Sequence, residues 1–255
     1  MPTTSTRIAL STEEQVARLT LHNPPLNVID IPMMEELSQA LTDFESRPEI
    51  STVVISGSDK AFSVGVDVAA HTPEKIEQML TKFHAVIRTL VSTKKITLAQ
   101  VEGHCLGGGA ELAMVCDIVI TSPTAIWGFP EIRLGCYPPV ACTALAALVG
   151  QKRAAELIFT GRTMNGNDAA QIGLATRAAS DVDAALEESL SDLRNLSPAA
   201  LAITKKAFYA WDAMHFDKGL ARAEKIYFDD LMKTEDAREG INAFLEKRPP
   251  HWKGR

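Results

Sequence analysis

Short β-branched runs alternate with helical apolar stripes along the first half of the 255-residue chain. Thr52–Ser56 and Ile96–Val101 have the composition of buried strands. Between them, apolar residues recur at helical spacing from Ile76 to Leu90. Strands separated by helices in this way pair in parallel through right-handed crossovers. The sequence therefore predicts an α/β fold that is built on a parallel sheet.

Capping residues and apolar runs predict further elements in this first half. These elements are a hairpin at Arg7–Leu10 and Gln15–His22, a helix opened by Asp30 and Pro32, a helix opened by Thr72-Pro73-Glu74, and a strand at Asp117–Thr121.

The last part of the chain is predicted to be entirely helical. Ser197-Pro198 is an N-cap followed by proline, and the helix that it opens is expected to reach Trp211. Further helices are expected over Lys218–Met232 and from Thr234 to Leu245. We therefore expect a core over residues 1–195. Residues 196–255 would form a helical region that packs on this core or on another subunit.

Composition excludes several classes of protein. Apolar residues make up 46% of the chain and charged residues 23%, which is an ordinary globular balance. Acidic residues outnumber basic ones by 32 to 26, so binding to nucleic acid is not expected. The N-terminus lacks an apolar signal segment, and no apolar stretch approaches the roughly 18 residues of a membrane span. The four cysteines lack metal-ligand spacing. We expect a cytoplasmic protein with no metal and no membrane contact.

Three consecutive glycines, Gly107-Gly108-Gly109, stand between a predicted strand and a predicted helix. Glycines at such a turn let a ligand approach the backbone and leave N–H groups free. The two glycine patterns that bind nucleotide phosphates are absent from this segment. The turn is therefore either a tight packing turn or a site where N–H groups hold a carbonyl oxygen that becomes an oxyanion.

Two glutamates stand just after turns that contain glycine or proline. Glu111 lies in the first turn of the helix after the glycines, and Glu131 follows Pro130 at a second helix start. Each carboxylate is explained equally by its favourable interaction with a helix dipole. A pair beside one oxyanion site would instead divide the roles of general acid and general base.

A third segment, Ala61–Asp67, is a small glycine-containing loop that follows the Thr52–Ser56 strand. Together with the glycine segment and Pro130–Gly135, it resembles the crotonase family, also called the enoyl-CoA hydratase/isomerase family. The resemblance covers the chain from Asn23-Pro24-Pro25 to Ala243–Arg248. It implies an α/β, crotonase-like spiral of ββα turns with a C-terminal helical trimerisation region. It also implies homotrimers, commonly paired into hexamers.

The resemblance further implies an acyl-CoA thioester substrate, with coenzyme A present only as part of that substrate and no separate cofactor. The backbone N–H groups of Val66 and Gly108 would form the oxyanion hole. Glu111 would orient and deprotonate a water molecule, and Glu131 would supply a proton to the α-carbon or the vinylogous γ-carbon.

The substrate-binding positions implied by the resemblance are Val64, Asp67, Phe129, Tyr137 and Pro138. Val64 and Val66 replace smaller residues, and a proline-containing loop replaces a glycine-rich one after Glu131. This loop and the Ala243–Arg248 ending are similar to those of cyclic dienoyl-CoA hydratases. They imply hydration of cyclohexa-1,5-diene-1-carboxyl-CoA in anaerobic aromatic degradation.

Other functions on the same scaffold remain open from the sequence. A general enoyl-CoA hydratase of fatty-acid oxidation has the same two carboxylates. A CoA thioester hydrolase or decarboxylase is a second alternative. An RNA-binding relative is a third, which the acidic net charge of −6 argues against.

Overall fold

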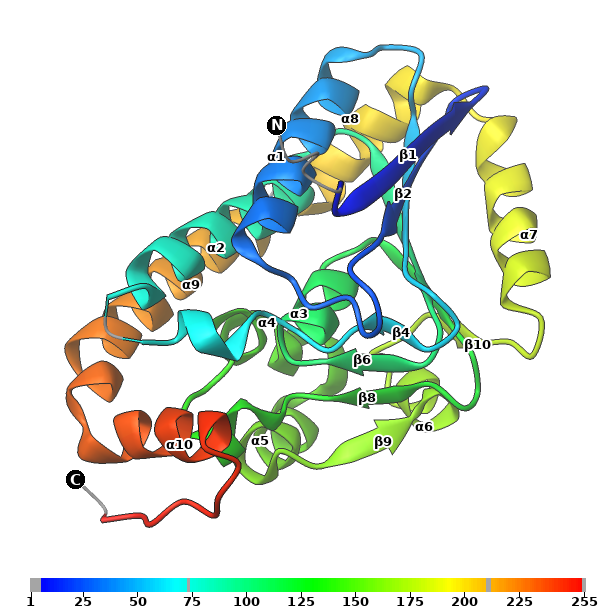
Figure 1. The fold of residues 1–255 in the computed structure, drawn as a ribbon. Coiled ribbons are helices and arrows are strands. Elements are labelled where there is room, and N and C mark those ends of the chain that lie inside the picture. The colour runs from blue at the N-terminus through cyan, green and yellow to red at the C-terminus, as the bar shows by residue number, and fades with distance from the viewer. Residues whose placement is uncertain (1–5, 73, 210–211, 254–255) are drawn as a thin grey trace.

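The computed structural model describes residues 6–72, 74–209 and 212–253 (Figure 1). A six-stranded sheet runs through the upper part of the molecule in the order β1-β2-β3-β5-β7-β10. β1 and β2 form the expected antiparallel hairpin, and all the other neighbours are parallel. The strands are β1 (Ile8–Glu13), β2 (Val16–Leu21), β3 (Thr52–Ser56), β5 (Ile96–Val101), β7 (Ile118–Thr121) and β10 (Arg177–Ala178).

A smaller four-stranded sheet lies below the first, in the order β4-β6-β8-β9 (Figure 1). β4, β6 and β8 are parallel to one another, and β9 is antiparallel to β8. The strands are β4 (Ala61–Ser63), β6 (His104–Leu106), β8 (Ile126–Gly128) and β9 (Thr163–Asn165).

The chain passes repeatedly from the large sheet to the small one. β3 leads to β4, β5 to β6 and β7 to β8, and each pair is followed by helical structure. The following elements are η1 (Val68–Ala70) with α2 (Ile76–Ser92), α3 (Gly108–Met114), and η2 (Pro130–Leu134) with α4 (Pro139–Val149). The spiral of ββα turns expected from the sequence is confirmed.

Helices cover both faces of the large sheet. Alternate strand residues point to opposite faces, so Val53 and Ile55 join the main core beneath α1 (Ile31–Ser46) and α2. Val54 points the other way, into a second apolar cluster beneath α7 (Val182–Arg194). Both faces are therefore buried, as expected for a mostly parallel sheet.

The start of α1 agrees with the sequence, and the start of α2 does not. Asp30 caps α1 by accepting a hydrogen bond from the Met33 N–H at 3.0 Å. α2 begins only at Ile76, and the Thr72 carbonyl accepts from the N–H groups of Lys75 and Ile76 in the turn before it. Pro73, which we expected in the first turn, lies outside the described residues.

Helices are the only regular elements among the described residues of 196–253, which end in an irregular stretch after Leu245, but one predicted boundary was wrong. α9 occupies Asp212–Asp229 rather than Lys218–Met232, because a separate 3₁₀ turn follows it at Leu231–Lys233. Trp211 lies outside the described residues. The remaining helices are α5 (Gln151–Thr160), α6 (Gly166–Gln171), α8 (Pro198–Tyr209) and α10 (Glu235–Leu245). No described helix is both long and apolar enough to cross a bilayer.

A buried ion pair fastens α8 to the large sheet. The Lys205 Nζ donates to Asp117 Oδ2 at 2.7 Å and to the Lys95 carbonyl at 2.8 Å. Asp117 Oδ2 also accepts from the N–H and the hydroxyl of Thr97. Only 5% of the Lys205 side chain and 13% of the Asp117 side chain are exposed. Removal of either partner therefore leaves an unpaired charge in a nearly dry site.

We predict that Lys205→Ala lowers the free energy of unfolding by roughly 3 to 5 kcal/mol, because the Asp117 carboxylate is left buried without its partner. Chemical denaturation of the two proteins measures the difference. Lys82→Ala is the matched control, because Lys82 pairs with Glu35 at the surface and should cost under about 1 kcal/mol. Equal losses in the two variants would contradict a special role for the buried pair.

Candidate active site

Three short segments leave the small sheet at the same edge. Residues 64–67 follow β4, Gly107 follows β6, and Phe129-Pro130-Glu131 follows β8. Because these three strands are neighbours and run parallel, their carboxyl ends lie side by side. The three sequence segments singled out above are therefore brought together at one place.

The backbone of Val66 lies against Gly108. A Cβ built on Gly108 would lie 3.3 Å from the Val66 nitrogen and 3.0 Å from its Cγ1, so a side chain at 108 would press on Val66 and the two backbones approach closely. The phenyl ring of Phe83 closes the same space from α2, at 3.2 Å. Gly108 opens α3, so its N–H has no partner within the helix. Two backbone N–H groups thus lie next to each other at one site.

The segment before α1 holds the Val66 backbone in place. The Val64 N–H donates to the Leu26 carbonyl, and the Asp67 N–H donates to the Ile29 carbonyl. The side-chain amide of Asn27 donates to the carbonyls of Ala61 and Phe62 in β4. The residues on either side of Val66 are therefore tied to residues 26–29.

Glu111 is buried on α3, and its side chain points to the start of α4. Its Oε1 accepts from the Ala141 N–H at 2.9 Å. Proline at 139 has no N–H, so Val140 and Ala141 carry the first free donors of α4. Burial raises the pKa of Glu111 to about 7, and the hydrogen bonds from these two N–H groups oppose a larger rise.

Glu131 lies in the 3₁₀ turn after β8, and its carboxyl faces the glycine turn. A Cβ on Gly107 would lie 2.7 Å from Glu131 Oε1, and the φ of +54° at Gly107 also favours glycine. Glu131 Oε2 is buried and finds no partner among the described residues. Burial, and then the charge of Glu111, raises the pKa of Glu131 well above its usual range.

The two carboxyl groups therefore have different environments. Two backbone donors stabilise Glu111 as a carboxylate, whereas Glu131 has only a single weak stabilising contact with its own backbone. Near pH 7 this arrangement favours an ionised Glu111 beside a protonated Glu131. Such a pair supplies one general base and one general acid.

A cavity of about 620 Å³ adjoins this site. Its wall includes three of the positions selected from the sequence, Val64, Val66 and Asp67. Asp67 also caps η1 through the Ala69 N–H. The opposite wall comes from the end of α10 and the residues after it, including Phe244, Leu245 and Arg248.

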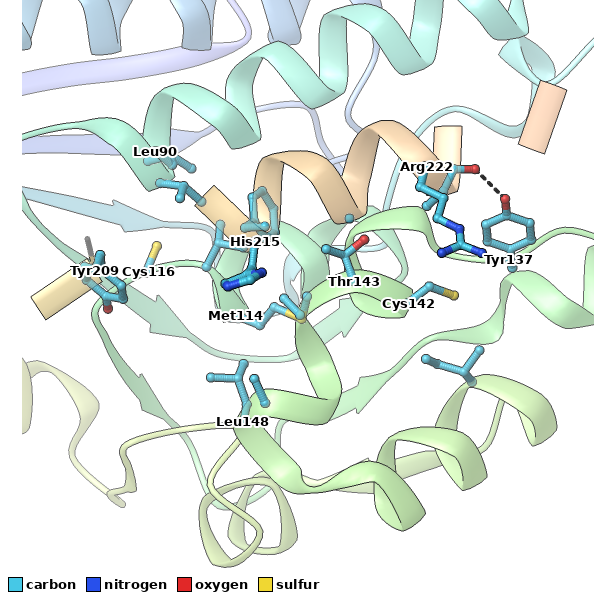
Figure 2. Close-up of a pocket in the computed structure, with 18 of the residues that line it drawn as sticks. Leu90, Met114, Cys116, Tyr137, Cys142, Thr143, Leu148, Tyr209, His215 and Arg222 are labelled. Atoms are coloured by element: carbon cyan, nitrogen blue, oxygen red, sulfur yellow. Dashed lines mark hydrogen bonds between the residues drawn. The ribbon is translucent and has the colours of Figure 1, made fainter. Parts of the chain in front are cut away.

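A second cavity of about 790 Å³ lies between α4, α5 and α9 (Figure 2). It is lined mostly by apolar side chains, and Tyr137, Cys142 and Arg222 lie together at one end of it. Cys142 is also close enough to both glutamates for their charges to act on its thiol. That end of the cavity is therefore the one nearer the carboxyl pair.

Two of the expected substrate-binding residues do not line either cavity. Phe129 is completely buried in the core, and Pro138 is buried at the start of α4. Tyr137 lines the larger cavity, apart from Val64 and Asp67. The five expected positions are therefore divided between the smaller cavity, the larger cavity and the buried interior.

Sequence reasoning missed the residues that hold the expected ones. Ala141, Asn27 and Phe83 act through backbone contacts or packing, and no short motif contains them. In the described part of the chain, no three His, Cys, Asp or Glu side chains gather closely enough to hold a metal ion.

Comparison with known proteins agrees with this geometry. The family model described as enoyl-CoA hydratase/isomerase matches residues 11–255. A cyclohexa-1,5-dienecarbonyl-CoA hydratase of Thauera aromatica is 32% identical, over 98% of this chain and 97% of that protein. A probable enoyl-CoA hydratase of Bacillus subtilis is 34% identical, over 97% and 98% of the two chains. The crystal structure of a carnitinyl-CoA hydratase from Mycobacterium avium aligns with a TM-score of 0.89 at 30% identity, over 99% and 100% of the two chains.

Paired carboxyl groups beside two backbone donors on a ββα spiral define the class of site as one for acid–base chemistry at a polarised carbonyl. The chain belongs to the enoyl-CoA hydratase/isomerase family, and it is an enzyme of the hydro-lyase type.

Proposed function

We propose that the protein adds water across the double bond of an α,β-unsaturated acyl-CoA. The observation that carries the proposal is the buried Glu111–Glu131 pair, whose two environments favour opposite protonation states beside the Val66–Gly108 turn. Hydration needs one group to take a proton from water and another to give a proton to carbon.

The N–H groups of Val66 and Gly108 would receive the thioester carbonyl oxygen. Negative charge develops on that oxygen when water attacks the conjugated double bond, and fixed backbone donors stabilise the charge without reorganisation. The smaller cavity, which begins at Val64 and Val66, is proposed to hold the CoA part of the substrate.

Glu111 is proposed as the base. Its carboxylate removes a proton from water while the oxygen attacks the β-carbon, and Glu131 then delivers its proton to the α-carbon (or to the γ-carbon of a dienoyl substrate). The buried and unpartnered Oε2 of Glu131 supports this role, because it leaves that oxygen available to the reactants.

We predict that Glu111→Gln and Glu131→Gln each lower turnover by about 10²- to 10⁴-fold while acyl-CoA binding is retained. In the parent enzyme kcat/KM should rise with pH through about 7, as Glu111 ionises, and fall at higher pH as Glu131 loses its proton. Loss of enoyl absorbance measures the rate, and Glu102→Gln, at a half-buried carboxyl outside the site, is the control.

Near-normal turnover in either variant would remove that glutamate from the mechanism. Assays for free thiol and for CO₂ on the same samples separate hydration from the alternatives. Release of either product faster than loss of the double bond would favour thioester hydrolysis or decarboxylation.

We further propose a cyclic dienoyl-CoA, cyclohexa-1,5-diene-1-carboxyl-CoA, as the acyl substrate, and hence a place in anaerobic aromatic degradation. The relative from Thauera aromatica supports this choice. Val66 Cγ1 also reaches the Gly108 turn, where the thioester carbonyl is proposed to lie, so this branched side chain narrows the space next to the acyl group. A flat ring fits a narrow slot and loses less rotational freedom on binding than a flexible chain does.

We predict a higher kcat/KM for this cyclic substrate than for crotonyl-CoA. Val66→Ala keeps the backbone donor and opens the slot, so the ratio of cyclic to linear kcat/KM should fall by about tenfold. Val68→Ala alters the same cavity farther along its wall and should leave the ratio unchanged. Faster turnover of crotonyl-CoA by the parent enzyme would overturn the cyclic assignment and favour a general enoyl-CoA hydratase.

We also propose that residues 196–255 form the contacts of a homotrimer, or of a hexamer built from two such trimers. Large apolar side chains are exposed on α5 and α8, where Phe159, Ile203 and Phe208 are each at least 70% exposed. Leu148 and Ile226 extend this surface at the larger cavity. Phe159, Leu148 and Ile226 all line the larger cavity, and apolar side chains gathered in this way are typical of protein–protein contacts.

We predict that Phe208→Asp, on the exposed face of α8, reduces the molar mass in sedimentation equilibrium from that of a trimer or hexamer to that of a monomer. Leu10→Asp, on the exposed face of β1, is the control and should not change it. A monomeric parent protein would exclude this assembly.

A further inference from the structure

A short segment of chain that touches α9 connects Glu131 to the start of α4, which holds Glu111. Glu131 lies in η2, and the segment then turns at Gly135 and continues through Tyr137 to α4. The Ala141 N–H of α4 is the donor to Glu111. Any movement of this segment therefore moves both Glu131 and the donor that holds Glu111.

Tyr137 joins the middle of this segment to α9. Its hydroxyl donates to the Ala223 carbonyl at 2.6 Å, the bond drawn as a dashed line in Figure 2. Its ring packs edge-on against Tyr227, with the ring centroids 5.1 Å apart. Tyr227 is almost completely buried, and its side chain also bonds to the neighbouring Cys136.

α9 is itself fixed to α2 directly beside Ala223. Glu224 accepts from His84 Nδ1 at 2.7 Å and from Arg88 Nη2 at 2.8 Å. Arg88 also donates to Asp217, about two turns earlier on α9. These bonds lower the pKa of Glu224 to about 2, against the effect of burial, so the carboxylate stays ionised. The contact that Tyr137 makes is therefore with a firmly held helix.

We infer that Tyr137 is a positioning residue, whose hydroxyl bond to α9 holds the segment between Glu131 and α4 so that the Ala141 N–H stays on Glu111. The inference rests on the proposed hydration for its kinetic consequence, but the contact itself does not depend on substrate. Tyr137 was expected from the sequence to bind the acyl group, and the structure instead gives its hydroxyl a partner in the protein.

The direction of the effect on Glu111 follows from its surroundings. Burial raises the pKa of Glu111, and the N–H groups of Ala141 and Val140 lower it. The other titratable groups that face it are Glu131 and Cys142, and burial keeps both of them protonated near pH 7. If the segment becomes less ordered, these N–H groups move away from Glu111 while its carboxyl stays buried. The pKa of Glu111 then rises further.

The test is Tyr137→Phe, which removes one hydroxyl and keeps the ring. We expect kcat to fall by about 10- to 100-fold with KM changed less than about twofold, because small displacements of reacting groups are costly. The rise of kcat/KM with pH should move to higher pH by roughly half a unit or more. Thr143→Val is the matched control, because its hydroxyl bonds only to the Pro139 carbonyl within α4.

A second measurement keeps the inference independent of the proposed function. NMR titration of protein with ¹³C-labelled glutamate carboxyls, with the Glu111 signal assigned from Glu111→Gln, reports its pKa without substrate. Tyr137→Phe should raise the pKa of Glu111. Glu224→Gln should raise it by a smaller amount, because it weakens the contact between α9 and α2. If the pKa of Glu111 is the same in Tyr137→Phe as in the parent protein, the inference is overturned. If the pKa is unchanged but KM is raised, Tyr137 binds the acyl group instead. A raised titration in an enzyme without hydratase activity would overturn only the proposed function.

Discussion

Parallel pairing of three short strands brings the site together. β4, β6 and β8 each have three residues, and a chain segment with functional residues leaves each of them at the same edge. An antiparallel β6 would send Gly108 to the far edge, away from Val66 and Glu131. The long route through the large sheet makes the parallel arrangement possible, because each return to the small sheet passes through a buried strand and a covering helix.

Burial then gives the site its chemistry. A carboxyl group taken from water holds its proton more tightly, and two such groups close together cannot both ionise readily. The start of α4 decides which one ionises. Proline at 139 removes one donor and leaves the next two N–H groups of the helix pointing at Glu111, while Glu131 meets the glycine turn. The proline-containing loop that set this chain apart in sequence therefore leads into the helix start whose N–H groups distinguish the two acids, in addition to placing Tyr137 in the wall of the larger cavity.

Local signals predicted the elements and the three site segments, but they did not predict the contacts between them. Asp30 and the β-branched run at Thr52–Ser56 act within a few residues, so the helix start and the strand agree with the sequence. The bond from Ala141 to Glu111 joins residues thirty positions apart, and no short-range pattern contains that information. Phe129 shows the same limit, since an aromatic residue beside a site segment is equally suited to the core, and only the packing of β8 decides between the two places.

The C-terminal helices differ from the rest of the chain in composition, yet they contact the elements that carry the site. Lys205 ties α8 to the base of the large sheet, and Glu224 ties α9 to α2, both through charges that are at least partly shielded from water. α10 forms one wall of the cavity that begins at Val64. A region that only joined subunits would need none of these inward contacts. α9 also contacts the segment between Glu131 and α4 through the hydroxyl of Tyr137, so the C-terminal region supports the site itself as well as the large sheet.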